Sequence, residues 1–138
     1  MFKISTKGDY GLLLLSAIAE KTNAGRAFVS LNEIAKERKL SLPYLSQIIL
    51  PLKEAGLVKS KEGRDGGYCL AKAPREISLM QILEALEGPV AAVRCCGDKS
   101  AECGSKSSCN LKSTWQEANT VLVTFLGSKT LEDTLIHN

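Results

Sequence analysis

The sequence predicts a mainly α-helical protein with one small β-hairpin, arranged as a winged helix-turn-helix followed by a long C-terminal helix. Three observations support this fold class. Two short helical patterns, each opened by a serine that can cap it, lie a few residues apart near position 40. Two short strand-like segments follow them directly. An apolar pattern with heptad-like intervals then occupies residues 108–126.

The first helix is expected over residues 7–22. Ser5 or Thr6 can cap its start, and residues 23–26 interrupt it. Its apolar side chains recur at helical spacing: Tyr10, Leu13, Leu14, Ala17 and Ile18.

The second and third helices form the predicted helix-turn-helix. Ser30 and Glu33 match a capping box at the start of the second helix. Ser41 caps the third, with Pro43 just inside it, and Pro51 is expected to kink or loosen its last turn. The third helix is expected to turn one set of side chains inward: Leu42, Leu45, Ile48, Ile49 and Leu52. It turns another set outward: Ser41, Tyr44, Ser46 and Gln47.

Residues 57–60 and 67–70 have the composition of two strands around a Gly-rich turn, with Arg64 near the tip. A hairpin placed directly after the second helix of a helix-turn-helix is the wing of a winged helix. Ser78 then caps a helix over residues 79–86, which Gly88 and Pro89 end.

Positive charge is unevenly distributed along the chain. The net charge is only +3, but residues 36–75 contain nine Lys or Arg against four Asp or Glu. Such an excess is typical of a phosphate-binding face, although a charge run alone can be solvated surface. Together with the helix-turn-helix, it favours double-stranded DNA as the partner.

Four of the five cysteines lie within residues 95–109: Cys95, Cys96, Cys103 and Cys109. Apart from one Ala, this segment contains no other apolar side chain that could bury a thiol. Closely spaced soft thiolates suit zinc or an iron–sulfur cluster. The fifth, Cys69, lies in the second predicted strand and is expected to be structural.

The chain has no signal-peptide pattern at its start and no stretch that approaches the roughly 20 apolar residues of a membrane span. We therefore expect a cytoplasmic protein without a membrane partner, whose thiols stay reduced. No enzyme is expected, because the sequence shows no Cys–His pair, no phosphate-cradling Gly loop and no pair of carboxylates in a shared apolar pocket.

The last helix carries a seam at intervals of four and three residues: Leu111, Trp115, Ala118, Leu122 and Phe125. The seam could pack on its own domain, but a homodimer is the preferred interpretation because helix-turn-helix proteins usually read paired half-sites. Residues 130–136 are expected to form a short closing helix. The predicted organisation is a DNA-binding domain over 1–88, a cysteine-rich loop over 89–109, and a dimerisation helix with its tail over 110–138.

Several segments together resemble the winged-helix transcriptional regulators typified by IscR, NsrR and CymR. They are KISTKGDYG (3–11), LPYLSQ (42–47), LKEAGLV (52–58), GRDGGY (63–68) and ILEALEG (82–88). The resemblance implies a homodimeric bacterial transcription factor. In the IscR and NsrR branches it also implies an iron–sulfur cluster, 2Fe-2S or 4Fe-4S, whose state switches the affinity for the DNA operator.

Carried over to this sequence, the three cysteine ligands would be Cys96, Cys103 and Cys109, with Cys95 as an alternative to Cys96. IscR-like members have a histidine three residues after the last cysteine, where this chain has Lys112. Asp9 matches an aspartate of NsrR-like members and could reach the loop of a partner subunit. Asp9 is the preferred fourth ligand, with Cys95, an external small thiol, water or no further ligand as the alternatives. Asp9 is also favourable simply as an acidic residue in a first helical turn.

For DNA, the resemblance and the charge pattern assign base reading to the outward face of the third helix: Ser41, Tyr44, Ser46 and Gln47. Phosphate and minor-groove contacts fall to the wing: Lys59, Lys61 and Arg64. Tyr44 could instead pack in the core, and Arg64 could lie in a solvated turn.

Three other functions remain open at this point. The loop cysteines could form a reversible disulfide switch, or they could hold zinc with an extra ligand. Alternatively, the apolar seam could dock a protein partner, as the resemblance to CymR permits.

Overall fold

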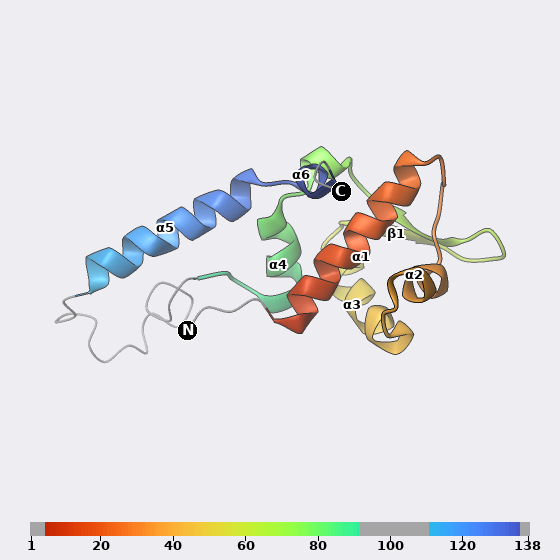
Figure 1. Ribbon diagram of the computed structural model, residues 1–138, viewed down its shortest axis with the longest axis horizontal. Helices are drawn as coiled ribbons and strands as arrows, with labels where there is room; N and C mark the ends of the chain where they lie inside the picture. The colour runs from red at the N-terminus through yellow and green to blue at the C-terminus, as the bar shows by residue number, and fades with distance from the viewer. Residues whose placement is uncertain (1–4, 92–110, 136–138) are drawn as a thin grey trace.

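The computed structural model describes residues 5–91 and 111–135 (Figure 1). The cysteine segment over 95–109 lies outside the described residues. Within them, the chain is mainly helical and carries one two-stranded antiparallel hairpin, which confirms the predicted fold class. The elements follow in this order: α1 (Thr6–Asn23), α2 (Leu31–Arg38), α3 (Leu42–Glu54), β1 (Val58–Lys61), β2 (Gly67–Leu70), a 3-10 turn (Pro74–Glu76), α4 (Leu79–Glu87), α5 (Lys112–Ser128) and α6 (Leu131–Leu135).

Helix α1 runs through the body of the molecule and contacts α3, α4, β2 and α6. Its start is tied to the end of α4, because the carboxylate of Glu87 accepts hydrogen bonds from the backbone N–H and the hydroxyl of Ser5. The Ser5 hydroxyl oxygen in turn accepts one from the N–H of Gly8 at 3.3 Å. The first turn of α1 and the last turn of α4 therefore lie side by side.

One apolar core joins the helices to the base of the hairpin. Its fully buried side chains include Leu14, Leu15, Ile18, Ile34, Leu45, Ile48, Ile49, Leu52, Ile77, Ile82 and Leu131. On α3 these residues recur at the three- and four-residue spacing that places them along one side of a helix. The core thus sets which side of α3 remains free.

The helix α3 continues through Pro51 to Glu54. A proline within a helix removes the N–H that would bond to the carbonyl four residues earlier. Burial of Leu52 one residue later holds the last turn in place, so the proline does not end the helix.

Strands β1 and β2 pair in the register Val58↔Leu70, Lys59↔Cys69, Ser60↔Tyr68 and Lys61↔Gly67. A third segment, which the sequence did not indicate, joins the hairpin. Val29 and Tyr68 exchange two backbone hydrogen bonds, of 2.9 and 2.8 Å. This bridge fixes the wing against the residues that lead into α2.

The chain returns to the body after α5. Ser78 and Thr130 form an isolated bridge, the N–H of Leu79 donates to the carbonyl of Lys129 at 2.9 Å, and that of Leu131 donates to the carbonyl of Ile77 at 2.9 Å. The short closing helix expected over residues 130–136 is present as α6, and it packs against α1. Figure 1 shows α5 projecting away from the body from this point.

Candidate nucleic-acid interface and switch region

The helix-turn-helix consists of α2 and α3, and a serine caps each helix. Ser30 Oγ accepts a hydrogen bond from the N–H of Glu33 at 3.1 Å, and Ser41 Oγ accepts one from the N–H of Tyr44 at 3.3 Å. Lys39 ends α2 in the left-handed conformation, with φ 56° and ψ 47°, and so turns the chain toward α3. The capping serines, which are readable in the sequence, therefore define both helix starts.

The side of α3 opposite the core is exposed. It carries Ser41, Ser46 and Gln47, three of the residues predicted to read bases. The prediction that Leu42 points inward is wrong, since its side chain is 37% exposed. Leu42 is the first residue of the helix and is not among the side chains that pack on the core. Leu50 on the same helix is 57% exposed.

Tyr44 lies at the edge of this surface and is half-buried. Its ring meets that of Tyr10 on α1 edge to face, with centroids 5.2 Å apart and an interplanar angle of 82°. Both of the alternatives raised for Tyr44 thus apply in part, because the ring packs on α1 while the residue borders the exposed face. The pairing with Tyr10 was not predictable from spacing, since the two residues lie in different helices.

The wing presents its basic residues to solvent. Lys59 and Lys61 are exposed on β1, and Arg64 is exposed at the turn. The ammonium group of Lys61 lies 5.4 Å from the ring centroid of Phe28, a cation–π contact that steadies it beside the segment before α2. All three cations are therefore accessible to solvent, and Lys61 and Arg64 lie beside the segment that leads into α2.

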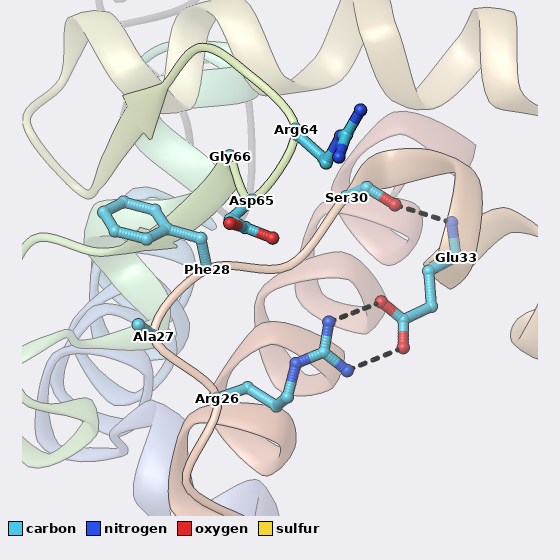
Figure 2. A pocket seen from close by; sticks show the side chains of 8 residues that line it. All are labelled: Arg26, Ala27, Phe28, Ser30, Glu33, Arg64, Asp65 and Gly66. Carbon is cyan, nitrogen blue, oxygen red and sulfur yellow. Dashed lines mark hydrogen bonds and ion pairs between the residues drawn. The ribbon is translucent and has the colours of Figure 1, made fainter.

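A shallow depression of about 330 Å³ separates the wing from the start of α2 (Figure 2). It is lined by Arg26, Ala27, Phe28, Ser30, Glu33, Arg64, Asp65 and Gly66. On one side, two hydrogen bonds of 3.0 Å join the guanidinium of Arg26 to the carboxylate of Glu33. Figure 2 shows Arg64 apart from this pair, on the wing side of the depression.

Ion pairs link α1, the loop after it and α2. Lys21 contacts Glu33 at 3.3 Å and Glu37 at 2.7 Å. The hydrogen bond from Arg26 is the main cause that holds the pKa of Glu33 below its ordinary value, with Lys21 acting in the same direction. The hydrogen bond that the Lys21 ammonium donates to the carboxylate of Glu37 is the main cause that raises the pKa of Lys21. This network orients α2 relative to α1.

We expect Glu33→Gln to lower the free energy of unfolding at pH 7 by about 0.5 kcal/mol, the range of exposed ion pairs. The ionised form of Glu33 is favoured in the folded state because the pKa of its carboxyl group is lowered there. Its contribution to the free energy of unfolding is therefore present above the ordinary pKa, and it is lost as the pH falls through the lowered pKa of the folded state. Urea unfolding between pH 7 and pH 3 should show a smaller acid-dependent loss in the variant. Glu62→Gln, on the exposed turn of the wing, is the matched control. An unchanged pH dependence in Glu33→Gln would contradict this assignment.

A different set of cations has no ion-pair partner within residues 5–91 and 111–135. These residues are all exposed and lie on α2, the turn, α3 and the wing: Lys36, Lys39, Lys53, Lys59, Lys61 and Arg64. Arg38 does not belong to this set because it pairs with Glu20. Unpaired cations around a helix-turn-helix are positioned to neutralise phosphates.

Of the predicted cluster ligands, only Asp9 lies within the described residues. It is exposed in the first turn of α1, the end that Ser5 ties to the last residue of α4. Cys95, Cys96, Cys103 and Cys109 lie outside the described part of the chain. Within that part, no group of three or more His, Cys, Asp or Glu could hold a metal ion. Cys69 is a half-buried free thiol in β2.

Helix α5 carries an apolar surface that its own chain leaves largely uncovered. Leu111, Trp115 and Phe125 of the predicted seam are 51%, 37% and 53% exposed, and Ala118 is exposed as well. Leu122 is half-buried, and Leu126 on the adjoining face is buried. The body therefore covers only the flank of α5 near its C-terminal end.

The family model described as Rrf2, iron-dependent transcriptional regulator, matches residues 4–137. This match covers nearly the whole chain. The protein belongs to the Rrf2 family. Rrf2 proteins similar to this one include the HTH-type transcriptional regulator IscR of Cereibacter sphaeroides, 35% identical over 132 residues, or 95% of this chain and 85% of the relative.

Two solved structures are also similar to this Rrf2 protein. CymR, the global cysteine regulator of Bacillus subtilis, has a TM-score of 0.82 at 37% identity, and the match covers 100% of this chain and 99% of the CymR chain. T. potens IscR has a TM-score of 0.76 at 37% identity, with coverage of 99% and 88%. The relatives are named as transcriptional regulators and not as enzymes, and this agrees with the prediction that the protein is not an enzyme. Among the described helices of the Rrf2 chain, none has the length and apolarity to cross a membrane.

Proposed function

We propose that this Rrf2 regulator binds DNA operators with an affinity that is switched by an iron–sulfur cluster held by its loop cysteines. The observation that carries the proposal is the position of these cysteines. They lie between Glu87, which ends α4 and is bonded to the start of α1, and Lys112, which begins the exposed helix α5. A change in the ligation of this segment acts on both neighbouring helices.

The donor set fits such a cluster. Cys96, Cys103 and Cys109 supply three soft thiolates, and Cys95 could replace Cys96. Asp9 is exposed at the end of the body where α4 leads into the segment, so its carboxylate is accessible as a fourth ligand from a partner subunit. When bound, the cluster would supply iron–thiolate bonds that constrain the loop. A coupling of about 1–3 kcal/mol would change DNA affinity 5- to 150-fold.

DNA binding is assigned to two kinds of contact. Ser41, Gln47 and the outer edge of Tyr44 would face the base edges in the major groove, with Ser46 beside them. Lys59 and Lys61 would contact phosphates. Arg64, at the tip of the wing, would enter a narrow A·T-rich minor groove, where the negative potential is enhanced.

Purification without air, followed by visible absorption and by iron and sulfide analysis, tests the proposal. Brown protein that contains both elements, and whose affinity for a selected operator changes on cluster loss, would support it. Colourless protein that contains zinc would overturn it in favour of a zinc site. Reconstituted protein that never takes up iron would also overturn it.

The second candidate is a disulfide switch without a cluster. It is favoured by the presence of four cysteines in the loop, which allows a disulfide pair without a metal, and by similarity to a protein described as a global cysteine regulator. In this case operator affinity should change with thiol oxidation in metal-free protein. Mass spectrometry of alkylated peptides would identify the bonded pair.

Asp9→Asn should shift the visible absorption of the anaerobically purified protein if Asp9 is a ligand, because an amide is a poorer donor to iron than a carboxylate. Asp65→Asn on the wing is the matched control and should leave the spectrum unchanged. Identical spectra for the wild type and Asp9→Asn would remove Asp9 from the ligand set.

For the homodimer, Trp115→Asp should raise the dissociation constant at least about 30-fold, since a buried Trp at an interface commonly contributes 2 kcal/mol or more. Thr124→Asp, on the opposite side of α5, is the control and should dissociate no more than the wild type. Sedimentation velocity over a range of concentrations measures both. A Trp115 variant that stays dimeric but loses a protein partner would support the docking alternative instead.

A further inference from the structure

The exposed side of α3 carries a stripe of three residues, Leu42, Ser46 and Leu50. They are spaced four residues apart, so they follow one another along the same side of the helix. The two leucines are 37% and 57% exposed. Neither belongs to the core or to the partly buried side chains that pack on it. Among the residues that the structure describes, both leucines therefore keep apolar surface that the core does not cover.

Ser46 presents a less polar surface to solvent than a serine usually does. Its hydroxyl donates a hydrogen bond to the backbone carbonyl of Leu42 at 3.0 Å. A serine has only one hydroxyl proton, so this bond uses its donor within the helix. Outward it offers its Cβ and an acceptor oxygen, and the stripe as a whole is therefore predominantly apolar.

The surroundings of the stripe favour DNA as its occupant. Two cations without an ion-pair partner among the described residues lie at the ends of α3: Lys39 in the turn before the helix and Lys53 in its last turn. These charges complement a polyanion and would hold α3 close to a phosphate backbone. In the major groove, the apolar group that identifies a base is the C5-methyl of thymine.

We propose that the Leu42–Ser46–Leu50 stripe recognises thymine methyl groups in the major groove. The inference rests on the proposed DNA-binding function and names the base chemistry that this helix selects. Gln47, exposed beside the stripe, complements it, because a glutamine amide pairs with N6 and N7 of adenine while an adjacent apolar side chain contacts the methyl of thymine. The helix thus selects A·T pairs through apolar contacts as well as hydrogen bonds.

Replacing thymine by deoxyuridine tests the proposal, because the exchange removes only the methyl group. An operator enriched from a random duplex library by the wild-type protein is resynthesised with one thymine at a time replaced. At one or more positions the wild type should bind roughly three- to tenfold more weakly, the effect of one lost apolar contact. Leu42→Ala and Leu50→Ala should weaken binding to the thymine operator by similar factors.

The decisive quantity is the coupling between the two changes. Each leucine variant should lose its sensitivity to deoxyuridine at the position that the leucine contacts. Lys53→Ala is the control, because it removes an expected phosphate contact. It should weaken DNA binding but keep the wild-type ratio of affinities between thymine and deoxyuridine operators.

Both leucines are exposed, so their truncation leaves no cavity, and circular dichroism and thermal melts would verify the fold. If both leucine variants keep the wild-type ratio of affinities between thymine and deoxyuridine operators, the inference is overturned, whereas the proposed DNA binding still stands. If no operator is enriched, the proposed function fails and this inference fails with it.

Discussion

Anaerobically purified Cys103→Ala and Cys109→Ala should be colourless and should contain little iron or sulfide. Each variant removes one of three loop thiolates, and a cluster that keeps only two of these thiolates is readily lost. The absorption of the wild type above 400 nm, a region where the protein alone does not absorb, is the quantity to compare. This is the largest effect that we expect from a single substitution.

Cys69→Ala is the matched control for these variants. Cys69 is a half-buried thiol in β2, opposite Lys59, and lies in the wing rather than in the loop. Its loss should leave the colour unchanged and reduce stability only slightly, as expected for a small partly buried side chain. The loop variants should remain folded and dimeric, because α5 is outside the segment. Full colour in both loop variants would exclude Cys103 and Cys109 as ligands.

Gly67→Ala should lower the free energy of unfolding by about 2–4 kcal/mol and detach the wing. Gly67 has φ 139°, and a Cβ added there would lie 2.4 Å from the backbone carbonyl oxygen of Val29. Backbone cannot yield as a flexible side chain can, so the bridge between Val29 and Tyr68 must open. Thermal denaturation should show the lowered stability, and operator affinity should fall roughly tenfold as the contacts of the wing are lost.

Gly63→Ala separates the effect of steric crowding on stability from the effect of an unfavourable backbone conformation. Gly63 has φ 108° in the turn that leads to Gly67, but an added Cβ would meet nothing within 4 Å. This variant should cost only about 1 kcal/mol, the strain of an unfavourable φ. Equal losses for the two variants would show that the approach of the wing to Val29 is unimportant for stability.

The local signals in the sequence were sufficient for most of the helices. Capping serines at positions 30, 41 and 78 define three helix starts, and the structure shows the side chain of each accepting the expected backbone hydrogen bond. The spacing of apolar residues in α3 predicted the buried set except at Leu42. Such features depend on residues within about one helical turn, which a single sequence contains.

Contacts between distant segments were not predictable. The bridge between Val29 and Tyr68 involves a single residue on one side, too few for a strand pattern. The edge-to-face contact of Tyr10 with Tyr44, and the hydrogen bond of Ser5 to Glu87, join different helices. Among the site residues, the assignments of Ser41, Gln47 and the loop cysteines stay predictions, because they depend on DNA and metal rather than on the fold.

The return of the chain to the body after α5 makes that helix a lever. Its fulcrum is the short stretch where Thr130 bridges to Ser78 and where the buried Leu131 anchors α6. With 17 residues, α5 is about 25 Å long, so each degree of tilt at the fulcrum moves its far end by about 0.4 Å. The cysteine segment joins α5 at that far end, where a small force has the greatest mechanical advantage.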